Sequence, residues 1–295
     1  MISLDITNTL AKVVTPTRGI PEQEFRTMEN TIKSYVADFN TECEAGGHEW
    51  AKSPYDEEVI SAVESYVTSI QHLPIETVLW VGIGGSGLGP RVIKEVFENV
   101  NSPELIIVDT VDPAVINEEL KLVDWRKTLV VVASKSGGTL EPMRVFFLFE
   151  QKIKEVLDED AASRIVAITD PEDGVLKAYA DEKGYSTLPI DSGIGGRYSV
   201  FSPVGLLAMQ LLGADIRAFV RGAQEMDEIC KSSDMGENLA AQLAMVQFLL
   251  DTKRNYVIRV IMPYATRLQS LGRWEQQLIA ESLGKTEAFG PSPMA

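Results

Sequence analysis

Cysteine and histidine are scarce in this chain of 295 residues, which contains two of each. Cys43 and Cys230 lie far apart and form no C-x-x-C motif, so the sequence suggests neither a disulfide framework nor a zinc site. His48 and His72 have no metal-ligand partner at a useful spacing, and we interpret both as structural or solvated residues. We therefore expect no bound metal and no other cofactor. Reduced thiols fit a cytoplasmic protein best.

Basic residues are also few, with 27 Lys and Arg against 43 Asp and Glu. The net charge of −16 and the pI of about 4.6 argue against a nucleic acid or an anionic membrane as a partner. No stretch has about 18 uninterrupted apolar residues, so no transmembrane helix is expected, and the N-terminus does not resemble a signal peptide. With 45% hydrophobic residues, the composition is typical of a soluble globular protein with a substantial core.

Between residues 61 and 205, short apolar runs alternate with helical patterns. Continuously apolar strands separated by helices predict a parallel sheet covered on both faces, which is a doubly wound α/β fold. The predicted strands span 77–81, 105–110, 128–134, 164–170 and 185–190. Asp-Pro pairs at 112–113 and 170–171 are read as helix starts, and Gly184 as a helix end.

The rest of the chain is predicted to be mainly helical. A helical segment spans 1–60, the α/β domain spans 61–205, and connecting helices span 206–250. A further strand at 256–264, followed by a helix at 271–285, predicts the start of a second α/β domain over 251–295.

The first candidate loop is VGIGGSGLGP, from Val81 to Pro90. Its Gly82, Gly84 and Gly87 match G-x-G-x-x-G, the dinucleotide fingerprint, and Asp109 follows at a distance suited to a ribose hydroxyl. Another phosphate ligand is the preferred interpretation, since a glycine-rich turn exposes backbone amides at a helix N-terminus and the Ser86 hydroxyl can donate to a phosphate oxygen. Tight packing without any ligand is the third interpretation.

A second loop, Ser134 to Thr139, follows the third predicted strand with the sequence SKSGGT. Three hydroxyl groups, the Lys135 charge and two glycines make a dense set of donors suited to a phosphate monoester. The loop is not a Walker A motif, and a solvated cluster of helix caps is the alternative. A dinucleotide protein has no need of this loop, so it disfavours the oxidoreductase hypothesis.

Arg197 and Glu281 are the candidate catalytic residues. Arg197 follows three glycines in GIGGRYS, where a guanidinium can stabilise developing oxyanion charge, although a surface ion pair is the alternative. Glu281 lies four residues after Gln277 in QQLIAES, and its apolar neighbours suit a general base. An ordinary exposed glutamate is the alternative for this position.

In this order and spacing, the motifs GIGGSGLGP, SKSGGTLEP, GGRYSVFSPVGL and QQLIAESLGK resemble those of the glucose-6-phosphate isomerase family. The resemblance runs from about residue 20 to the end of the chain. It implies two sugar-isomerase (SIS) domains of flavodoxin-like α/β type, with no metal or nucleotide. It also implies a homodimeric cytoplasmic enzyme of glycolysis and gluconeogenesis that acts on hexose 6-phosphates.

The resemblance assigns a role to each candidate residue. The sugar phosphate would bind to a set of residues from the first two loops: Gly85, Ser86, Ser134, Lys135, Ser136 and Thr139. Arg197 would stabilise an enediolate, Gln277 would orient the substrate, and Glu281 would transfer a proton between C2 and C1. A non-catalytic sugar-phosphate-binding SIS module is the main alternative, and an NAD-dependent oxidoreductase is a weaker one.

The end of the sequence departs from the family's pattern. The family continues into an Asp-Gln-His motif, whose histidine helps open the sugar ring, and a lysine near its C-terminus reaches the site. Neither has a counterpart here, and His48 and His72 do not match. We therefore expect the sequence to be an incomplete copy of a longer enzyme, with ring opening and dimerisation affected.

Overall fold

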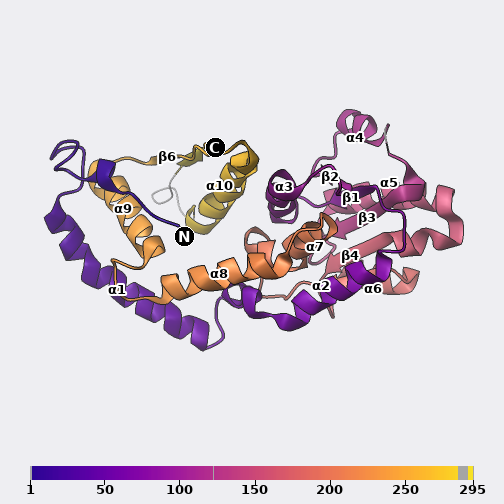
Figure 1. The fold of residues 1–295 in the computed structure, drawn as a ribbon, viewed down its shortest axis with the longest axis horizontal. Helices are drawn as coiled ribbons and strands as arrows, with labels where there is room; N and C mark the ends of the chain where they lie inside the picture. The colour runs from indigo at the N-terminus through magenta and orange to yellow at the C-terminus, as the bar shows by residue number, and fades with distance from the viewer. Residues whose placement is uncertain (1, 122, 285–291, 295) are drawn as a thin grey trace. The chain divides into compact units, whose positions relative to one another are not determined.

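The computed structural model describes residues 2–121, 123–284 and 292–294, and the chain folds as two compact units (Figure 1). The larger unit consists of Tyr55–Phe219 and Met262–Leu278. The smaller unit consists of the residues up to Pro54, Val220–Ile261 and the residues from Ile279 onward. Each unit thus combines segments distant in the sequence. The four consecutive segments expected from the sequence stay a prediction.

A five-stranded, fully parallel sheet forms the centre of the larger unit, in the order β2-β1-β3-β4-β5. Its strands are β1 Thr77–Val81, β2 Glu104–Val108, β3 Thr128–Ala133, β4 Ile165–Thr169 and β5 Ser186–Pro189. Every residue of β3 and β4 is buried, as expected for inner strands covered on both faces. The strands lie where the apolar runs predict them, and the doubly wound α/β fold is confirmed.

Among the described residues, α1 and α2 precede the first strand, and the other α-helices alternate with the strands or follow them. The α-helices are α1 Glu22–Glu44, α2 Glu57–Ile70, α3 Gly85–Phe97, α4 Pro113–Leu120, α5 Leu140–Leu157, α6 Val175–Lys183, α7 Pro203–Leu211, α8 Ile216–Lys231, α9 Leu239–Arg254 and α10 Gln269–Leu283. Short 3-10 helices include η6 Gly196–Phe201 and η7 Thr266–Leu268.

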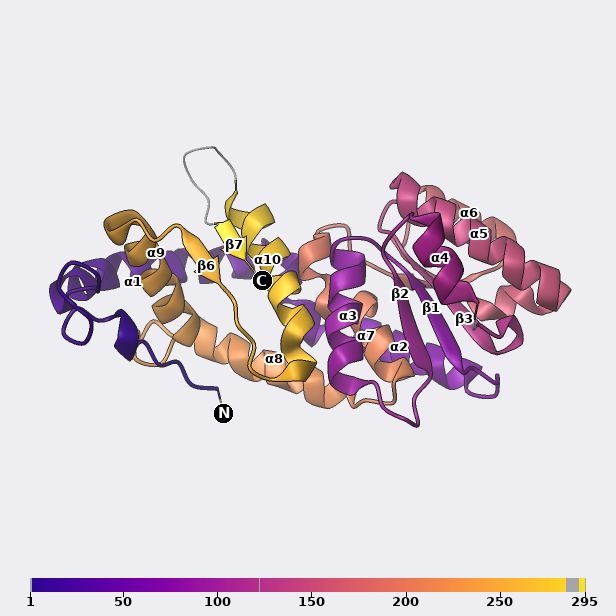
Figure 2. The ribbon, with the colours of Figure 1, turned by 90° about the horizontal axis from the view of Figure 1, so that it is seen from above.

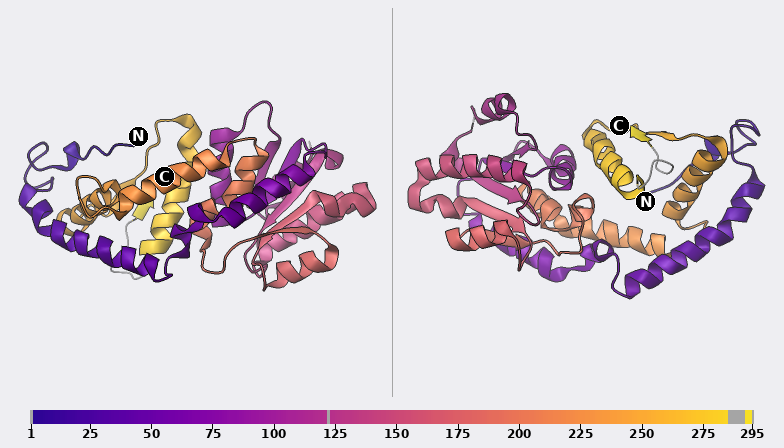
Figure 3. Two further views of the ribbon diagram at one scale, coloured as in Figure 1. Left: turned by 60° about the horizontal axis from the view of Figure 1, so that its bottom comes forward. Right: turned by 180° about the vertical axis from the view of Figure 1, so that it is seen from behind.

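Two groups of helices cover the sheet. On one face, side chains of α4, α5 and α6 share a buried core with alternate strand residues such as Leu79 and Val130. Figure 2 shows α5 and α6 side by side there, with α2, α3 and α7 on the other side of the strands. In Figure 3 the strands lie between the two groups. The helices cover both faces of the sheet and leave the ends of the strands uncovered. Ligands of such folds bind at the carboxyl ends of the strands.

The predicted helix boundaries are correct at two of three positions. The Asp112 carboxylate accepts from the Ala114 amide at 2.9 Å, so it caps α4 with Pro113 as the first helical residue. Gly184 ends α6 in the left-handed conformation, at φ +70°.

The start predicted for α6 at Asp170 is wrong. The Asp170 carboxylate accepts from the amides of Glu172 and Asp173, both at 3.0 Å, and so stabilises a turn rather than a helix. The helix begins at Val175, whose amide donates to the Ser136 carbonyl at 2.9 Å. The loop after β4 is therefore held against the loop after β3 before α6 can start.

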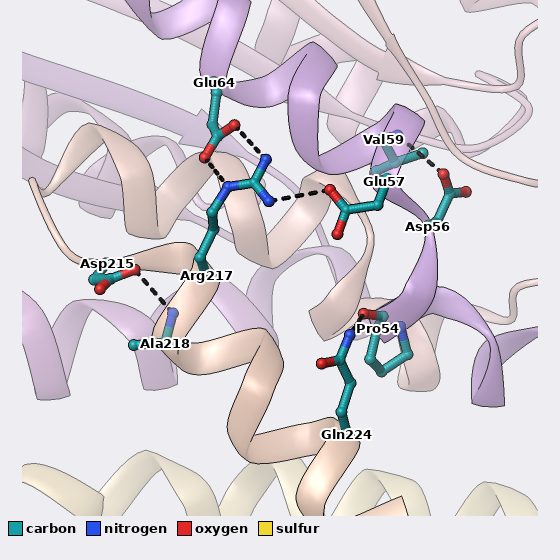
Figure 4. A network of polar contacts seen from close by, with 9 residues as sticks. All are labelled: Pro54, Asp56, Glu57, Val59, Glu64, Asp215, Arg217, Ala218 and Gln224. Atoms are coloured by element: carbon teal, nitrogen blue, oxygen red, sulfur yellow. Dashed lines mark hydrogen bonds and ion pairs between the residues drawn. The ribbon is translucent and has the colours of Figure 1, made fainter.

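A polar network fastens the first turn of α8 to α2 (Figure 4). Arg217 donates to both carboxylate oxygens of Glu64 at 2.8 Å and to Glu57 at 3.0 Å. Asp215 accepts from the Ala218 amide at 2.8 Å and caps the helix. The bidentate geometry makes this pair more specific than an ordinary exposed ion pair.

In the smaller unit, α1 and α9 pack around a core that includes Ile20, Met245 and Leu249. At the end of α9, Arg254 donates to the Gly19 carbonyl at 2.8 Å and to Glu24 at 2.9 Å. The strand predicted over 256–264 is shorter in the structure. It is β6 Ile258–Val260, which pairs in parallel with β7 Ser292–Met294.

The end of α9 delays the start of β6. The Tyr256 amide is bonded to the Leu250 carbonyl at 3.0 Å, so the chain two residues before the strand still belongs to the C-terminal cap of that helix. Within the described residues, every helix is too short or too polar to span a bilayer.

Candidate active site

The strand order places the first two predicted loops side by side. β1 lies between β2 and β3, so chain connections leave β1 and β3 in opposite directions across the sheet. In open α/β sheets, ligands bind at such a switch point, beyond the carboxyl ends of the strands. The loop 82–84 follows β1 and the loop 134–139 follows β3. Both candidate anion loops therefore lie where the fold favours a ligand.

Close packing accounts for most of the glycines in the first loop. A Cβ at Gly82 would lie 2.5 Å from the Ser86 carbonyl oxygen, and one at Gly87 would lie 2.4 Å from the Gly82 oxygen. Gly84 has φ +59°, which favours glycine. The Trp80 indole also donates to the Ser86 carbonyl at 2.9 Å. The fingerprint pattern thus describes a tightly wound turn rather than one specific ligand.

The Arg197 loop packs directly against this turn. A Cβ at Gly85 would lie 2.0 Å from the Gly196 carbonyl oxygen and 2.6 Å from the Arg197 amide nitrogen. Only a glycine allows this approach without a backbone shift. The Arg197 side chain is partly buried, and its guanidinium lies over the Tyr198 ring, 4.6 Å from the centroid. These contacts hold the Arg197 backbone against the glycine turn and its guanidinium over the Tyr198 ring.

Hydroxyl groups shape the second loop. The buried Ser134 hydroxyl accepts from the Gly137 amide at 3.2 Å, and the Ser136 hydroxyl accepts from the Gly138 amide at 3.1 Å. Each hydroxyl can accept one bond and still donate its own proton to an anion. Thr139 stands at the N-cap of α5, and its side chain makes no capping hydrogen bond to that helix. The arrangement suits a phosphate at the N-terminus of α5.

Lys135 joins the loops that follow β3, β4 and β5. Its ammonium group donates to the carbonyl oxygen of Ser192, and to that of Ile194 at 3.4 Å. Its own carbonyl accepts from the Thr169 hydroxyl and the Asp170 amide, both at 2.9 Å. The sequence predicts only a charge for the anion at this position, and the bridging contacts were not foreseen. They depend on carbonyl groups 57 and 59 residues away, which no local motif indicates.

Gln277 of α10 approaches the first loop. A Cβ at Gly84 would lie 3.1 Å from the Gln277 side-chain nitrogen. The larger unit therefore contains every predicted site residue except Glu281, and it gathers them at the carboxyl end of the sheet. Glu281 lies one helical turn after Gln277, in the part of α10 that belongs to the smaller unit, and its side chain is exposed. Tyr198 was missed, although its place beside Arg197 in GGRYS is a usable signal.

The other charged groups considered from the sequence have local partners. Asp109, the candidate ribose ligand, accepts from Arg91 of α3 at 2.7 Å. His48 lies 2.7 Å from a Glu42 oxygen and packs against the Phe39 ring, in the smaller unit. In the part of the chain that the structure describes, no group of three or more His, Cys, Asp or Glu side chains is arranged to hold a metal ion.

Residues 57–290 match the model of the phosphoglucose isomerase family, and so include the whole five-stranded sheet and all nine predicted site residues. The chain belongs to the phosphoglucose isomerase family. Among curated relatives, it is 36% identical over 241 residues to a glucose-6-phosphate isomerase of Thermus thermophilus. It is also 36% identical over 219 residues to one of Methanocaldococcus jannaschii.

Family membership is accompanied by a clear difference in length. The chain spans 56% and 53% of these two relatives, so it covers about half the length of the curated proteins that it matches. The matched regions account for 82% and 74% of this chain.

Solved structures of relatives have the same fold. A hypothetical protein of Thermus thermophilus matches with a TM-score of 0.81 at 32% identity, over 93% of this chain and 65% of that one. A glucose-6-phosphate isomerase of Chlamydia trachomatis matches with a TM-score of 0.71 at 30% identity, over 81% of this chain and 47% of that one. The tagatose-6-phosphate ketose/aldose isomerase of Escherichia coli, at 13% identity and a TM-score of 0.53, shares the fold.

Proposed function

We propose that this chain binds a hexose 6-phosphate at the carboxyl ends of β1 and β3 and interconverts glucose 6-phosphate and fructose 6-phosphate. Family membership supports the reaction class. The observation that carries the proposal is the meeting of the hydroxyl-rich loop with the Arg197 loop, through the hydrogen bonds of Lys135. An anion site and a fixed guanidinium are the two parts that such an isomerisation needs beside a base.

The phosphate is proposed to bind to the loop after β3. Ser134, Ser136 and Thr139 would donate hydroxyl protons, and the N-terminus of α5 would add backbone amides and the helix dipole. Gly85 and Ser86 lie at the start of α3, after the neighbouring strand β1, and would contact the substrate from that side. Lys135 adds positive charge beside this site in a protein whose net charge is −16.

The proton transfer is proposed to use Glu281 as the base. In the open-chain aldose, Glu281 takes the proton from C2, and the electron pair forms the C1–C2 double bond while negative charge develops on O1. Arg197 would stabilise this enediolate. The proton is then returned to C1, and a proton moves from O2 to O1, which gives the ketose. No other reactant is required.

The position of Glu281 along α10 supports this role. It follows Gln277 by four residues, so both side chains lie on one face of the helix, about 6 Å apart along its axis. Gln277 contacts the Gly84 turn and is proposed to orient the sugar. A base one helical turn after Gln277 on this face is therefore the candidate for the proton transfer.

The cellular setting of the proposal follows from the substrate. Cys43 and Cys230 are both free thiols, and burial raises the pKa of each. Free thiols fit the reducing cytoplasm, where hexose phosphates are found.

We also propose, from family membership, that the active form is a homodimer.

The experiment measures fructose 6-phosphate formation and, in D₂O, exchange of the C2 proton of glucose 6-phosphate by NMR. Affinity for 6-phosphogluconate is measured in parallel by calorimetry. Glu281→Gln is expected to lower exchange and turnover by about 10²- to 10⁴-fold while leaving that affinity nearly unchanged. Gln276→Ala, a neighbouring change on α10, is the control and should retain both.

Two results would contradict the proposal. Binding of 6-phosphogluconate without exchange or turnover in the wild-type chain favours a non-catalytic sugar-phosphate-binding module. Retained exchange in Glu281→Gln would mean that another group is the base.

A further inference from the structure

The N-terminus of α10 is held by a residue from another helix. The Glu95 carboxylate, on the last turns of α3, accepts from the Ser270 amide at 2.7 Å and from the Ser270 hydroxyl through its second oxygen. Ser270 is 4% exposed, and its amide is among the first of α10, which have no partner within the helix. The carboxylate therefore satisfies two buried donors and places a negative charge at the positive end of the helix dipole.

The contact is reciprocal. Arg267, in η7 just before α10, donates to the Val96 carbonyl at 3.1 Å, in the last turn of α3. The carbonyls of a last turn also lack partners within their helix, and a guanidinium there interacts favourably with the negative end of the dipole. Glu95 of α3 thus caps α10, and Arg267 of the preceding η7 caps α3, across 175 and 171 residues of sequence.

The two helices are in contact at a second point, which is in the candidate active site. At the beginning of α3, Gly84 lies beside the Gln277 side chain. At the end of α3, Glu95 holds Ser270. α10 therefore runs antiparallel to α3 from Ser270 to Gln277, a length of about 10 Å. The caps fix the Ser270 end of this α10 segment, and Gln277, at its other end, lies beside the glycine turn.

We propose that Glu95 is a positioning residue for the active site, with Arg267 as its counterpart. It fixes the start of α10 against α3, and through the rigid helix it sets where the Gln277 amide meets the Gly84 turn. The inference rests on the proposed function for its effect on turnover, but the placement of the helix is independent of activity. Glu95 lies at the far end of α3 from the glycine turn, so it acts through α10 and does not touch the substrate.

The test compares Glu95→Ala, Glu95→Gln and Arg267→Ala with the control Glu76→Ala, which removes an exposed ion pair with Lys127 from the same unit. Amide hydrogen exchange is measured for the start of α10, for residues 275–278 and for the turn 82–87. Glu95→Ala should speed exchange at Ser270 by about 10-fold or more, because two bonds to a charged acceptor are lost. It should also speed exchange around Gln277 and Gly84.

Kinetics and ligand binding give the second readout. Misplacement of Gln277 is expected to lower kcat by about 10- to 100-fold, with little change in the affinity for inorganic phosphate, whose proposed site is the loop after β3. Glu95→Gln keeps an acceptor for the Ser270 amide and should recover part of kcat. Glu76→Ala should match the wild type in every measurement.

Each outcome decides the proposal. Faster exchange confined to the start of α10, with unchanged exchange at 82–87 and 275–278, makes Glu95 a local cap and overturns it. Unchanged kcat in a catalytically active chain also overturns it. If the wild-type chain binds phosphate but does not turn over, the proposed function fails, while the exchange measurements still decide whether Glu95 positions Gln277.

Discussion

Lys135, in the loop after β3, donates from its ammonium group to the carbonyl oxygen of Ile194, in the loop after β5, at 3.4 Å. The same group bonds to the Ser192 carbonyl. These carbonyls precede Gly195, Gly196 and Arg197 in the chain. A single side chain thus links the proposed phosphate loop to the loop that presents the guanidinium. The role of Lys135 in this link depends on the length of its side chain and on its N–H donors as well as on its charge.

Replacement of this side chain should loosen the Arg197 loop. In Lys135→Met, which keeps most of the side-chain length, amide exchange over residues 193–197 is expected to rise by about 10-fold, since hydrogen bonds from a charged donor are lost. Turnover should fall because the guanidinium is less well fixed. Lys135→Arg keeps the charge and should recover part of the slow amide exchange over residues 193–197 and part of the turnover. Unchanged exchange over 193–197 in Lys135→Met would show that the bridge does not order the loop.

Gly85→Ala is expected to destabilise the larger unit. Its Cβ would lie 2.0 Å from the Gly196 carbonyl oxygen, so one of two backbones must move. Overpacking of this kind costs about 1–3 kcal/mol in the free energy of unfolding, measured by denaturant titration. The matched control is Gly222→Ala in α8, where no described atom lies within 4 Å of the added Cβ. That change should stabilise the chain by about 0.5–1 kcal/mol. Equal effects of the two substitutions would rule out the packing explanation.

The buried Glu150 of α5 gives a prediction about pH. Burial by itself would raise its pKa, but hydrogen bonds from Lys154, Tyr185 and Tyr179 outweigh burial and hold the pKa below the usual 4.5. The Tyr179 hydroxyl donates at 2.8 Å, Lys154 donates at 2.8 Å, and Tyr185 donates to the same oxygen. Because the pKa of the folded state is depressed, the stabilisation is complete above pH 4.5 and is lost as the pH falls through the folded-state value.

Glu150→Gln should therefore lower the free energy of unfolding by about 1–3 kcal/mol at pH 7, as expected for weakened bonds to a charged acceptor. The difference from the wild type should shrink as the pH is lowered below about 4. Thermal unfolding of both proteins from about pH 3 to about pH 8 measures this difference in stability. Glu155→Gln, at an exposed position one turn later, should have a smaller effect. A difference that is constant with pH would contradict the assigned cause.

Ligand specificity can be tested through Asp109. Its carboxylate is paired with Arg91 at 2.7 Å, and both side chains are partly buried, so binding of a ribose hydroxyl there would have to break an ion pair. We expect 6-phosphogluconate to raise the unfolding temperature and NAD to leave it unchanged at the same concentration. A shift with NAD alone would favour the oxidoreductase hypothesis, despite membership of the isomerase family.

Much of the fold follows from local features of the sequence. The continuously apolar runs at 128–133 and 165–169 can only be buried on both sides, which requires a parallel sheet with helices on each face. Asp112 and Gly184 mark helix ends because their capping contacts are local. Asp170 has the same Asp-Pro pattern and fails, since the amide of Val175 is bonded to a loop 39 residues earlier in the chain.

For the candidate site, the sequence alone determined which residue types are present and in which loops: hydroxyls and glycines after β3, an arginine after glycines, and Gln277 and Glu281 on one helical face. The tertiary structure decided how most of them meet. Strand order put β1 beside β3, a missing Cβ at Gly85 admitted the Arg197 loop, and Glu95 reached Ser270 from another helix. The last two contacts join residues about 110 to 175 positions apart. They exist only when the sheet and its helices are packed, because no local periodicity or spacing encodes a partner at that distance.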